Sequence, residues 1–246
     1  MTTDKAGVLR ALHVPGSPLV LPNIWDAASA LAVQEAGFPA VATGSAAVAR
    51  VLGYADGEGT PVDEMMAAVS RITRAVDVPV TADVERGYGL KPAELVERLA
   101  AAGAVGCNLE DTDPRTGELL DAGVQAEFLA EVRAAAGQDL VINARIDTYL
   151  LGRTSTQEAL ERARLYREAG ADCVYPITLA DEDGIRALVA EVGGPVNILF
   201  RPGTPSLGRL AELGVARISF GGGLHKAAHA YAESLFAKVR DGQSPY

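Results

Sequence analysis

The sequence predicts an α/β protein built as one (β/α)8 TIM barrel, and three observations support this fold class. Short apolar, β-branched segments alternate with Ala-rich amphipathic segments along the chain, which is typical of parallel βα units. The junctions repeat one pattern, in which a glycine ends a helix shortly before the next strand, as at Gly170 and Gly214. Eight strands can be counted in 246 residues, which is the number and length typical of this barrel.

Each expected strand is a short apolar run that ends in polar residues. A doubly wound open sheet is the alternative fold. No Gly-x-Gly-x-x-Gly or Walker sequence follows any of these strands, which disfavours the nucleotide-binding form of that alternative. The eight expected strands are Leu19–Ile24, Ala40–Thr43, Val78–Asp83, Val105–Glu110, Leu140–Ala144, Cys173–Pro176, Val196–Leu199 and Ala216–Phe220.

The chain contains no linker or low-complexity segment that would divide it, so we expect a single domain over residues 1–246. Residues 1–18 are expected to form an N-terminal helix and a lead-in to the first strand. Residues 224–246 contain an Ala-rich helix, expected over Leu224–Val239, and a short tail.

The composition excludes several classes of partner. A formal net charge of -10 disfavours nucleic acid and anionic membranes, although a local arginine and a metal ion can still hold an anionic substrate. The N-terminal residues lack a signal peptide, and no apolar run approaches the roughly 18 residues of a membrane span. Cys107 and Cys173 lie in apolar strand-like runs and are expected to be buried free thiols. We therefore expect a soluble, cytoplasmic protein.

Two carboxylates, Asp83 and Glu85, directly follow a buried strand and precede two glycines. A carboxylate at the end of a buried strand needs a partner, because removing it from water costs several kcal/mol or more. A hard divalent cation such as Mg2+ is the partner that oxygen ligands favour. A helix N-cap with a salt bridge is the alternative interpretation.

In a barrel the carboxyl ends of the strands form the active site. Three neighbouring strand ends carry Asp83, Glu85, Glu110 and Arg145, a set that fits one cation together with a small dianionic acid gripped by the arginine. The seventh strand adds Asn197 to the same region.

Other strand ends offer weaker candidates. The backbone amides of Ser45 and Ala46 follow Gly44 and are expected to hold an oxyanion, whereas a serine-hydrolase role for Ser45 lacks a partner histidine. Trp25 is either a core residue or a pocket wall. The scattered histidines, which are expected to be surface or helix residues and not catalytic bases, are His13, His225 and His229.

At these residues the sequence resembles the isocitrate lyase/phosphoenolpyruvate mutase superfamily, from about Leu19 to Gly223. The motifs that carry the resemblance occur in order and at barrel spacing. They are Leu21-Pro-Asn-Ile-Trp-Asp-Ala-Ala-Ser29, Thr43-Gly-Ser-Ala-Ala47, Leu52-Gly-Tyr-Ala-Asp-Gly57, Ala82-Asp-Val-Glu-Arg-Gly-Tyr-Gly89, Asn108-Leu-Glu-Asp111 and Asn143-Ala-Arg-Ile-Asp147.

The resemblance implies a barrel that binds Mg2+, with Mn2+ as the alternative ion, and a 2-oxo acid or its enolate. Asp83 resembles the direct metal ligand of the superfamily, while Asp56, Glu85 and Glu110 resemble its water-mediated ligands. Glu85 stands where many relatives have Asp. Arg145 resembles the substrate-contacting arginine, so the resemblance implies catalytic roles for Arg145, Asp56 and Glu110. The residues implied to line the substrate site are Trp25, Ser45, Ala46, Arg145 and Asn197.

The chain departs from the superfamily after the fourth strand. The lyases carry a Lys-Lys-Cys-Gly-His loop there, and the mutase and hydrolase branch carries a Lys/Asn-containing loop. This chain has neither over residues 111–121. The missing cysteine argues against cleavage of isocitrate or methylisocitrate with a cysteine as acid or base. The part that this chain shares with the superfamily is the predicted site for the metal ion and the 2-oxo acid.

Three functions follow as hypotheses. The first is an Mg2+-dependent carbon–carbon lyase acting on a small 2-oxo or 2-hydroxy dicarboxylate. The second is P–C bond chemistry on phosphonopyruvate, and the third is a protein that binds a 2-oxo acid without turning it over. Because the resemblance implies a C-terminal helix exchanged between subunits, we also expect a homo-oligomer, a dimer or tetramer.

Overall fold

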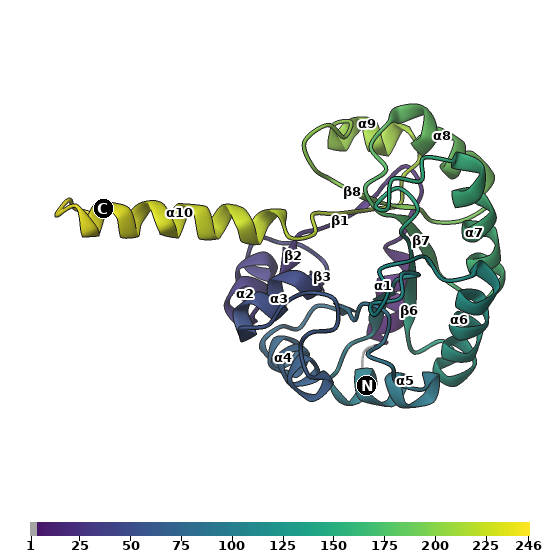
Figure 1. Ribbon diagram of the computed structural model, residues 1–246, viewed down its shortest axis with the longest axis horizontal. Coiled ribbons are helices and arrows are strands. Elements are labelled where there is room, and N and C mark those ends of the chain that lie inside the picture. The colour runs from purple at the N-terminus through teal and green to yellow at the C-terminus, as the bar shows by residue number, and fades with distance from the viewer. Residues whose placement is uncertain (1–3) are drawn as a thin grey trace.

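The computed structural model describes residues 4–246 as a ring of parallel strands surrounded by helices (Figure 1). Six strands pair in the order β2-β3-β4-β5-β6-β7, and three more pair in the order β1-β9-β8. The strands are β1 (Leu19–Leu21), β2 (Asn23–Ile24), β3 (Val41–Thr43), β4 (Val80–Asp83), β5 (Gly106–Leu109), β6 (Val141–Ile146), β7 (Cys173–Pro176), β8 (Asn197–Leu199) and β9 (Arg217–Ser219).

The two sheets join into one closed barrel. β1 and β2 are two halves of the single strand expected over Leu19–Ile24, separated at Pro22, which has no N–H to donate to a neighbouring strand. β1 pairs with β9 and β2 pairs with β3. A parallel bridge between Val174 and Val196 connects β7 to the segment that enters β8. The predicted (β/α)8 barrel is therefore confirmed, and the open doubly wound sheet is excluded.

Helices cover the outside of the barrel and one helix closes its floor. Helix α1 (Lys5–Ala11) precedes the first strand, and its Leu9 is fully buried in a cluster with residues of β1, β3 and β6. A Cβ atom on Gly106 would lie 2.8 Å from Leu9 Cδ2, so α1 packs directly against the strands. The remaining outer helices are α2 (Ala27–Glu35), α3 (Ser45–Leu52), α4 (Val62–Ala75), α5 (Pro92–Ala101), α6 (Ala122–Ala136), α7 (Thr156–Glu168), α8 (Glu182–Glu191) and α9 (Leu207–Glu212).

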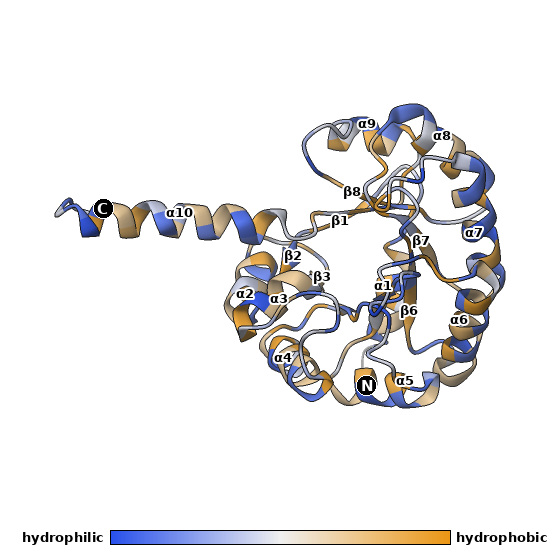
Figure 2. Ribbon diagram, viewed as in Figure 1, coloured by the Kyte–Doolittle hydropathy of each residue, from blue (hydrophilic) through white to orange (hydrophobic). Residues whose placement is uncertain are grey.

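The last helix, α10 (Gly223–Arg240), extends away from the barrel (Figure 1). Apolar and polar residues alternate along it (Figure 2), and Tyr231 and Phe236 are 68% and 69% exposed. His225, close to the root of the helix, is buried. No helix in residues 4–246 is long and apolar enough to cross a membrane. The helix expected over Leu224–Val239 is confirmed within one residue at each end.

Both cysteines are buried free thiols, as expected, but the prediction for His13 is wrong. His13 follows α1 and is only 7% exposed. Its Nδ1 lies 2.8 Å from the carbonyl oxygen of Leu9, an acceptor to which a protonated Nδ1 donates. Burial, followed by the positive charge of Arg217, lowers the pKa of His13 to about 4.

We expect the free energy of unfolding to fall as the pH drops from about 6.5 to 4. Above this range His13 is neutral in both states. Within it the unfolded chain binds a proton that the folded chain excludes, which costs about 2 kcal/mol of stability near pH 5. Urea unfolding of the wild type and of His13→Gln at about pH 7.5 and pH 5 checks this. A parallel pH dependence in the two proteins contradicts the prediction.

Candidate active site

Asp83 ends β4 and is held at one oxygen only. Its Oδ2 accepts hydrogen bonds from the backbone N and the Oγ of Ser45, both at 2.9 Å, and its own N–H donates to Thr43 Oγ1 at 2.8 Å. Within residues 4–246, the buried Oδ1 has no hydrogen-bond partner. A buried carboxylate oxygen without a partner is costly, and a metal ion is a partner that satisfies it.

Glu85 lies on a strained turn immediately after β4. Glu85 and Tyr88 have left-handed backbones, with φ of 51° and 58°, a conformation that costs roughly 1 kcal/mol or more for residues other than glycine. Glu85 Oε2 accepts from the backbone N of Glu58 at 2.6 Å, and Oε1 accepts from the Tyr88 hydroxyl at 2.8 Å. The turn therefore fixes the position of the Glu85 carboxylate.

The negative charges of Asp56, Glu85 and Glu110 are all affected by Asp83. Burial raises the pKa of Glu85 to about 7 and that of Glu110 to about 9, and it also raises the pKa of Asp56. The negative charge of Asp83 adds to the upward shift in all three. In Glu110 the positive charge of Arg145 opposes the shift. This crowding of negative charge favours a bound cation.

Arg145, on β6, is clamped between two acids. It forms an ion pair with Glu110 at 2.5 Å and contacts both carboxylate oxygens of Asp147, at 2.6 and 3.1 Å. These contacts use three of the five N–H groups of the guanidinium, which leaves donors for a further anion. Asp147 is itself fully buried and accepts a hydrogen bond from Thr112 Oγ1 at 2.6 Å.

Three contributors to the site had no assigned role in the sequence. Asp147 stands two residues after Arg145, and the period of two in a strand puts both side chains on one face, so the Arg-x-Asp spacing was a usable signal. Tyr88 and Glu58 contact Glu85 through a turn and through a distant loop. No local pattern predicts those contacts.

The donor set fits a hydrated Mg2+ ion. No group of three or more His, Cys, Asp or Glu side chains in the described part of the chain is arranged to hold a metal directly. Mg2+ commonly keeps several water ligands and binds proteins through one or two carboxylates. Asp83 has a buried Oδ1 free for direct contact with such an ion. The water-mediated roles of Asp56, Glu85 and Glu110 stay a prediction.

The remaining predicted site residues lie in different surroundings. The backbone N–H of Ser45 already donates a hydrogen bond to Asp83. Ala46 lies in the first turn of α3, where a backbone N–H has no acceptor within the helix. Asn197 is fully buried and accepts from Ser219 Oγ at 3.2 Å. Trp25 borders a separate, largely apolar cavity of about 310 Å³ between α2, α3 and α4, and its ring meets His225 edge to face.

We expect Asp147→Ala to destabilise the protein by about 3 kcal/mol, because it leaves the buried Arg145 guanidinium without its two-point partner. Asp63→Ala is the matched control. Asp63 pairs with Arg98 at the surface and is 83% exposed, so its loss should cost less than about 1 kcal/mol. Urea unfolding of both variants measures the difference. Equal costs would show that the clamp contributes nothing beyond an ordinary surface pair.

The chain is similar to known proteins over most of its length. The sequence profile described as phosphoenolpyruvate phosphomutase matches residues 9–240. Oxaloacetate decarboxylase of Rhodopseudomonas palustris (strain ATCC BAA-98 / CGA009) is 32% identical over 98% of this chain and 87% of its own length.

Solved structures share the fold over almost the whole chain. A candidate phosphonomutase from Burkholderia cenocepacia J2315 superposes with a TM-score of 0.89 at 43% identity, covering 96% of this chain and all of the other. A phosphonopyruvate hydrolase crystallised with oxalate and Mg2+ superposes with a TM-score of 0.86 at 25% identity, covering 97% of this chain and 88% of the other.

Proposed function

Since this chain belongs to the phosphoenolpyruvate phosphomutase family, we propose that it is an Mg2+-dependent carbon–carbon lyase. The family is part of the isocitrate lyase/phosphoenolpyruvate mutase superfamily, to which the sequence motifs pointed. Its proposed substrate is a small dicarboxylate that contains a 2-oxo-acid fragment. Oxaloacetate is the first candidate, because a relative that covers nearly the whole chain is an oxaloacetate decarboxylase.

One observation favours decarboxylation over cleavage reactions that need a general acid or base. Two acids of the loop after β5, Asp111 and Asp113, are occupied. Asp111 accepts from Arg162 and Tyr166, at 3.0 and 2.7 Å, and Asp113 pairs with Arg115. The loop also contains no cysteine, histidine or lysine. Loss of CO2 from a 2-oxo dicarboxylate needs an electron sink at the 2-oxo group and requires no base.

Decarboxylation of oxaloacetate would release CO2 and pyruvate. In oxaloacetate the bond between C3 and C4 breaks, and C4 leaves as CO2. The electron pair of that bond becomes the enolate of pyruvate, which then takes a proton at C3 from water. A divalent ion held by Asp83 would supply positive charge to the 2-oxo oxygen, an effect worth several kcal/mol of barrier.

The residues of this chain have separate roles in that proposal. Ser45 orients the Asp83 carboxylate, and the turn at Tyr88 orients Glu85. Arg145, with its remaining N–H donors, would bind a substrate carboxylate and add a fixed positive charge beside the forming enolate. The Ala46 amide would donate to the same anion.

We expect the wild type with Mg2+ to release pyruvate from oxaloacetate faster than Mg2+ alone, and Asp83→Ala to reduce that rate at least about a hundredfold, because the unpartnered oxygen is removed. Proton NMR follows pyruvate formation. Asp183→Ala, at a position 92% exposed on α8, is the control and should keep the wild-type rate. Circular dichroism verifies that each variant is folded. An Asp83→Ala protein with the wild-type rate would overturn the proposal.

A second candidate is P–C bond chemistry on phosphonopyruvate, favoured by the 43% identity to the candidate phosphonomutase. Phosphorus NMR of a phosphonopyruvate reaction distinguishes it from the lyase. Tight, Mg2+-dependent binding of oxalate without turnover of either substrate would instead support a protein that binds a 2-oxo acid without catalysis.

We also propose that the protein is a homo-oligomer in which α10 is covered by another subunit. The apolar side chains of Tyr231, Phe236 and Val239 are exposed on a helix that leaves the barrel. Covering them would remove apolar area from water, a favourable change of about 25 cal/mol per Å².

We expect light scattering to give a mass at least twice the 25.6 kDa of one chain. The double variant Tyr231→Glu/Phe236→Glu should lower that mass, because buried charges would oppose assembly. The exposed pair Glu233→Gln/Lys238→Gln on the same helix serves as the control. A wild-type mass of one chain rules the oligomer out.

A further inference from the structure

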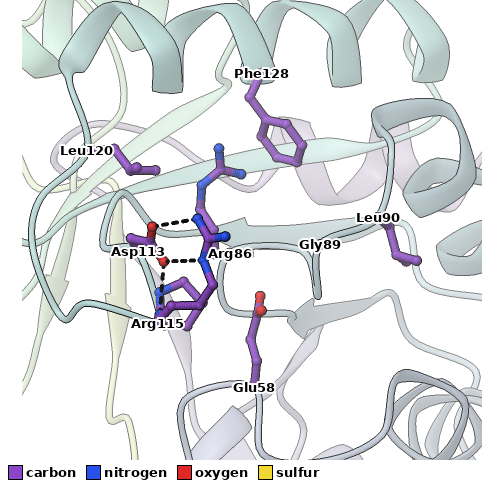
Figure 3. Close-up of a pocket in the computed structure, with 9 residues that line it drawn as sticks. Glu58, Arg86, Gly89, Leu90, Asp113, Arg115, Leu120 and Phe128 are labelled. Carbon is purple, nitrogen blue, oxygen red and sulfur yellow. Dashed lines mark hydrogen bonds and ion pairs between the residues drawn. The ribbon is translucent and has the colours of Figure 1, made fainter.

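A second cavity, of about 420 Å³, lies beside the turn that follows β4 (Figure 3). None of the acids proposed to hold Mg2+ lines it, and neither does Arg145. Arg86, the residue after Glu85, is part of its wall, so one turn of backbone separates this cavity from the metal centre. The lining residues are Glu58, Arg86, Gly89, Leu90, Asp113, Pro114, Arg115, Leu120 and Phe128.

Arg86 is a cation without a counter-charge in contact. Its guanidinium carbon lies 4.0 Å from the centre of the Phe128 ring, as Figure 3 shows in the upper part of the cavity. Its Nε is buried and has no hydrogen-bond partner in residues 4–246. Throughout that same range, no acid lies within 4.0 Å of its guanidinium nitrogens. Burial accordingly lowers the pKa of Arg86.

The two acids of the cavity are engaged elsewhere. Glu58 Oε1 accepts from the backbone N of Tyr88 at 2.6 Å. Asp113 accepts from the backbone N of Arg115 at 2.9 Å and from its guanidinium at 2.9 and 3.2 Å. These contacts compensate Arg115 and leave Arg86 as the cation able to take an external anion.

The rest of the wall limits what the anion can be. Leu90, Leu120 and Phe128 present apolar surface, whereas a compact inorganic anion prefers several polar donors. A carboxylate attached to an apolar body satisfies both parts: the carboxylate meets the guanidinium, and the body lies against the leucines and the ring.

We propose that this cavity is a binding site for a small organic monocarboxylate with an apolar body, separate from the metal centre. The carboxylate pairs with Arg86. Asp113, Arg115 and Leu120 belong to the loop between β5 and α6, so an occupant contacts that loop. The site does not depend on the reaction proposed above.

Phenylacetate is a suitable probe, and isothermal titration or ligand-observed NMR measures its binding. We expect the wild type to bind it with a Kd of about 1 mM. Phenylacetamide, which has the same shape and no charge, should bind at least about tenfold more weakly. Arg86→Gln should weaken phenylacetate binding by about the same factor, and Arg153→Gln, which alters an exposed arginine outside the cavity, should not.

Two further measurements separate this site from the metal centre. Asp83→Ala should bind phenylacetate as the wild type does, and Arg86→Gln should keep the Mg2+-dependent binding of oxalate. No saturable phenylacetate binding up to about 20 mM, equal binding by wild type and Arg86→Gln, or loss of phenylacetate binding in Asp83→Ala would each overturn the proposal.

Discussion

The site depends on a carboxylate that is restrained on one side and unsatisfied on the other. Ser45 holds Asp83 Oδ2 with both its amide and its hydroxyl, and Thr43 holds the Asp83 amide, so the carboxylate has little freedom to turn. Oδ1 is buried without a partner in the described chain. Leaving this acceptor without a partner costs stability, and a bound cation would satisfy it.

A single arginine, Arg145, pairs with two of the acids at this end of the barrel. Several acids meet at the mouth of the barrel, and Arg145 is shared between Glu110 and Asp147. Asp147 also accepts a hydrogen bond from Thr112, a residue near the start of the loop after β5. The position of that loop is thus linked through two contacts to the orientation of the arginine.

Much of the fold was predictable from the sequence because its signals are local. Apolar runs and glycine-ended helices identified the strands, and Cys173–Pro176 was predicted with its observed bounds. The break at Pro22 could have been inferred from the missing N–H of proline. The burial of His13 could not, because it depends on how α1 packs under strands far along the chain.

The site was predictable in its strand-end residues and less so in what supports them. Asp83, Glu110 and Arg145 follow from the barrel rule, since the carboxyl ends of the strands converge. The roles of Tyr88 and Glu58 depend on the conformation of a turn and a loop. The surroundings of Arg86 arise from α6 and the loop after β5, which meet only in three dimensions.

The left-handed backbone at Glu85 has a consequence for sequence change at this position. Aspartate occupies that backbone region more readily than glutamate does, so a shorter acid would relieve local strain. It would also withdraw the carboxylate by one methylene from the Tyr88 hydroxyl and the Glu58 amide that now anchor it. Replacing Glu85 by aspartate would therefore lower the backbone strain but lengthen both hydrogen bonds of the carboxylate. To restore these hydrogen bonds, Tyr88 and the loop that contains Glu58 would have to move closer.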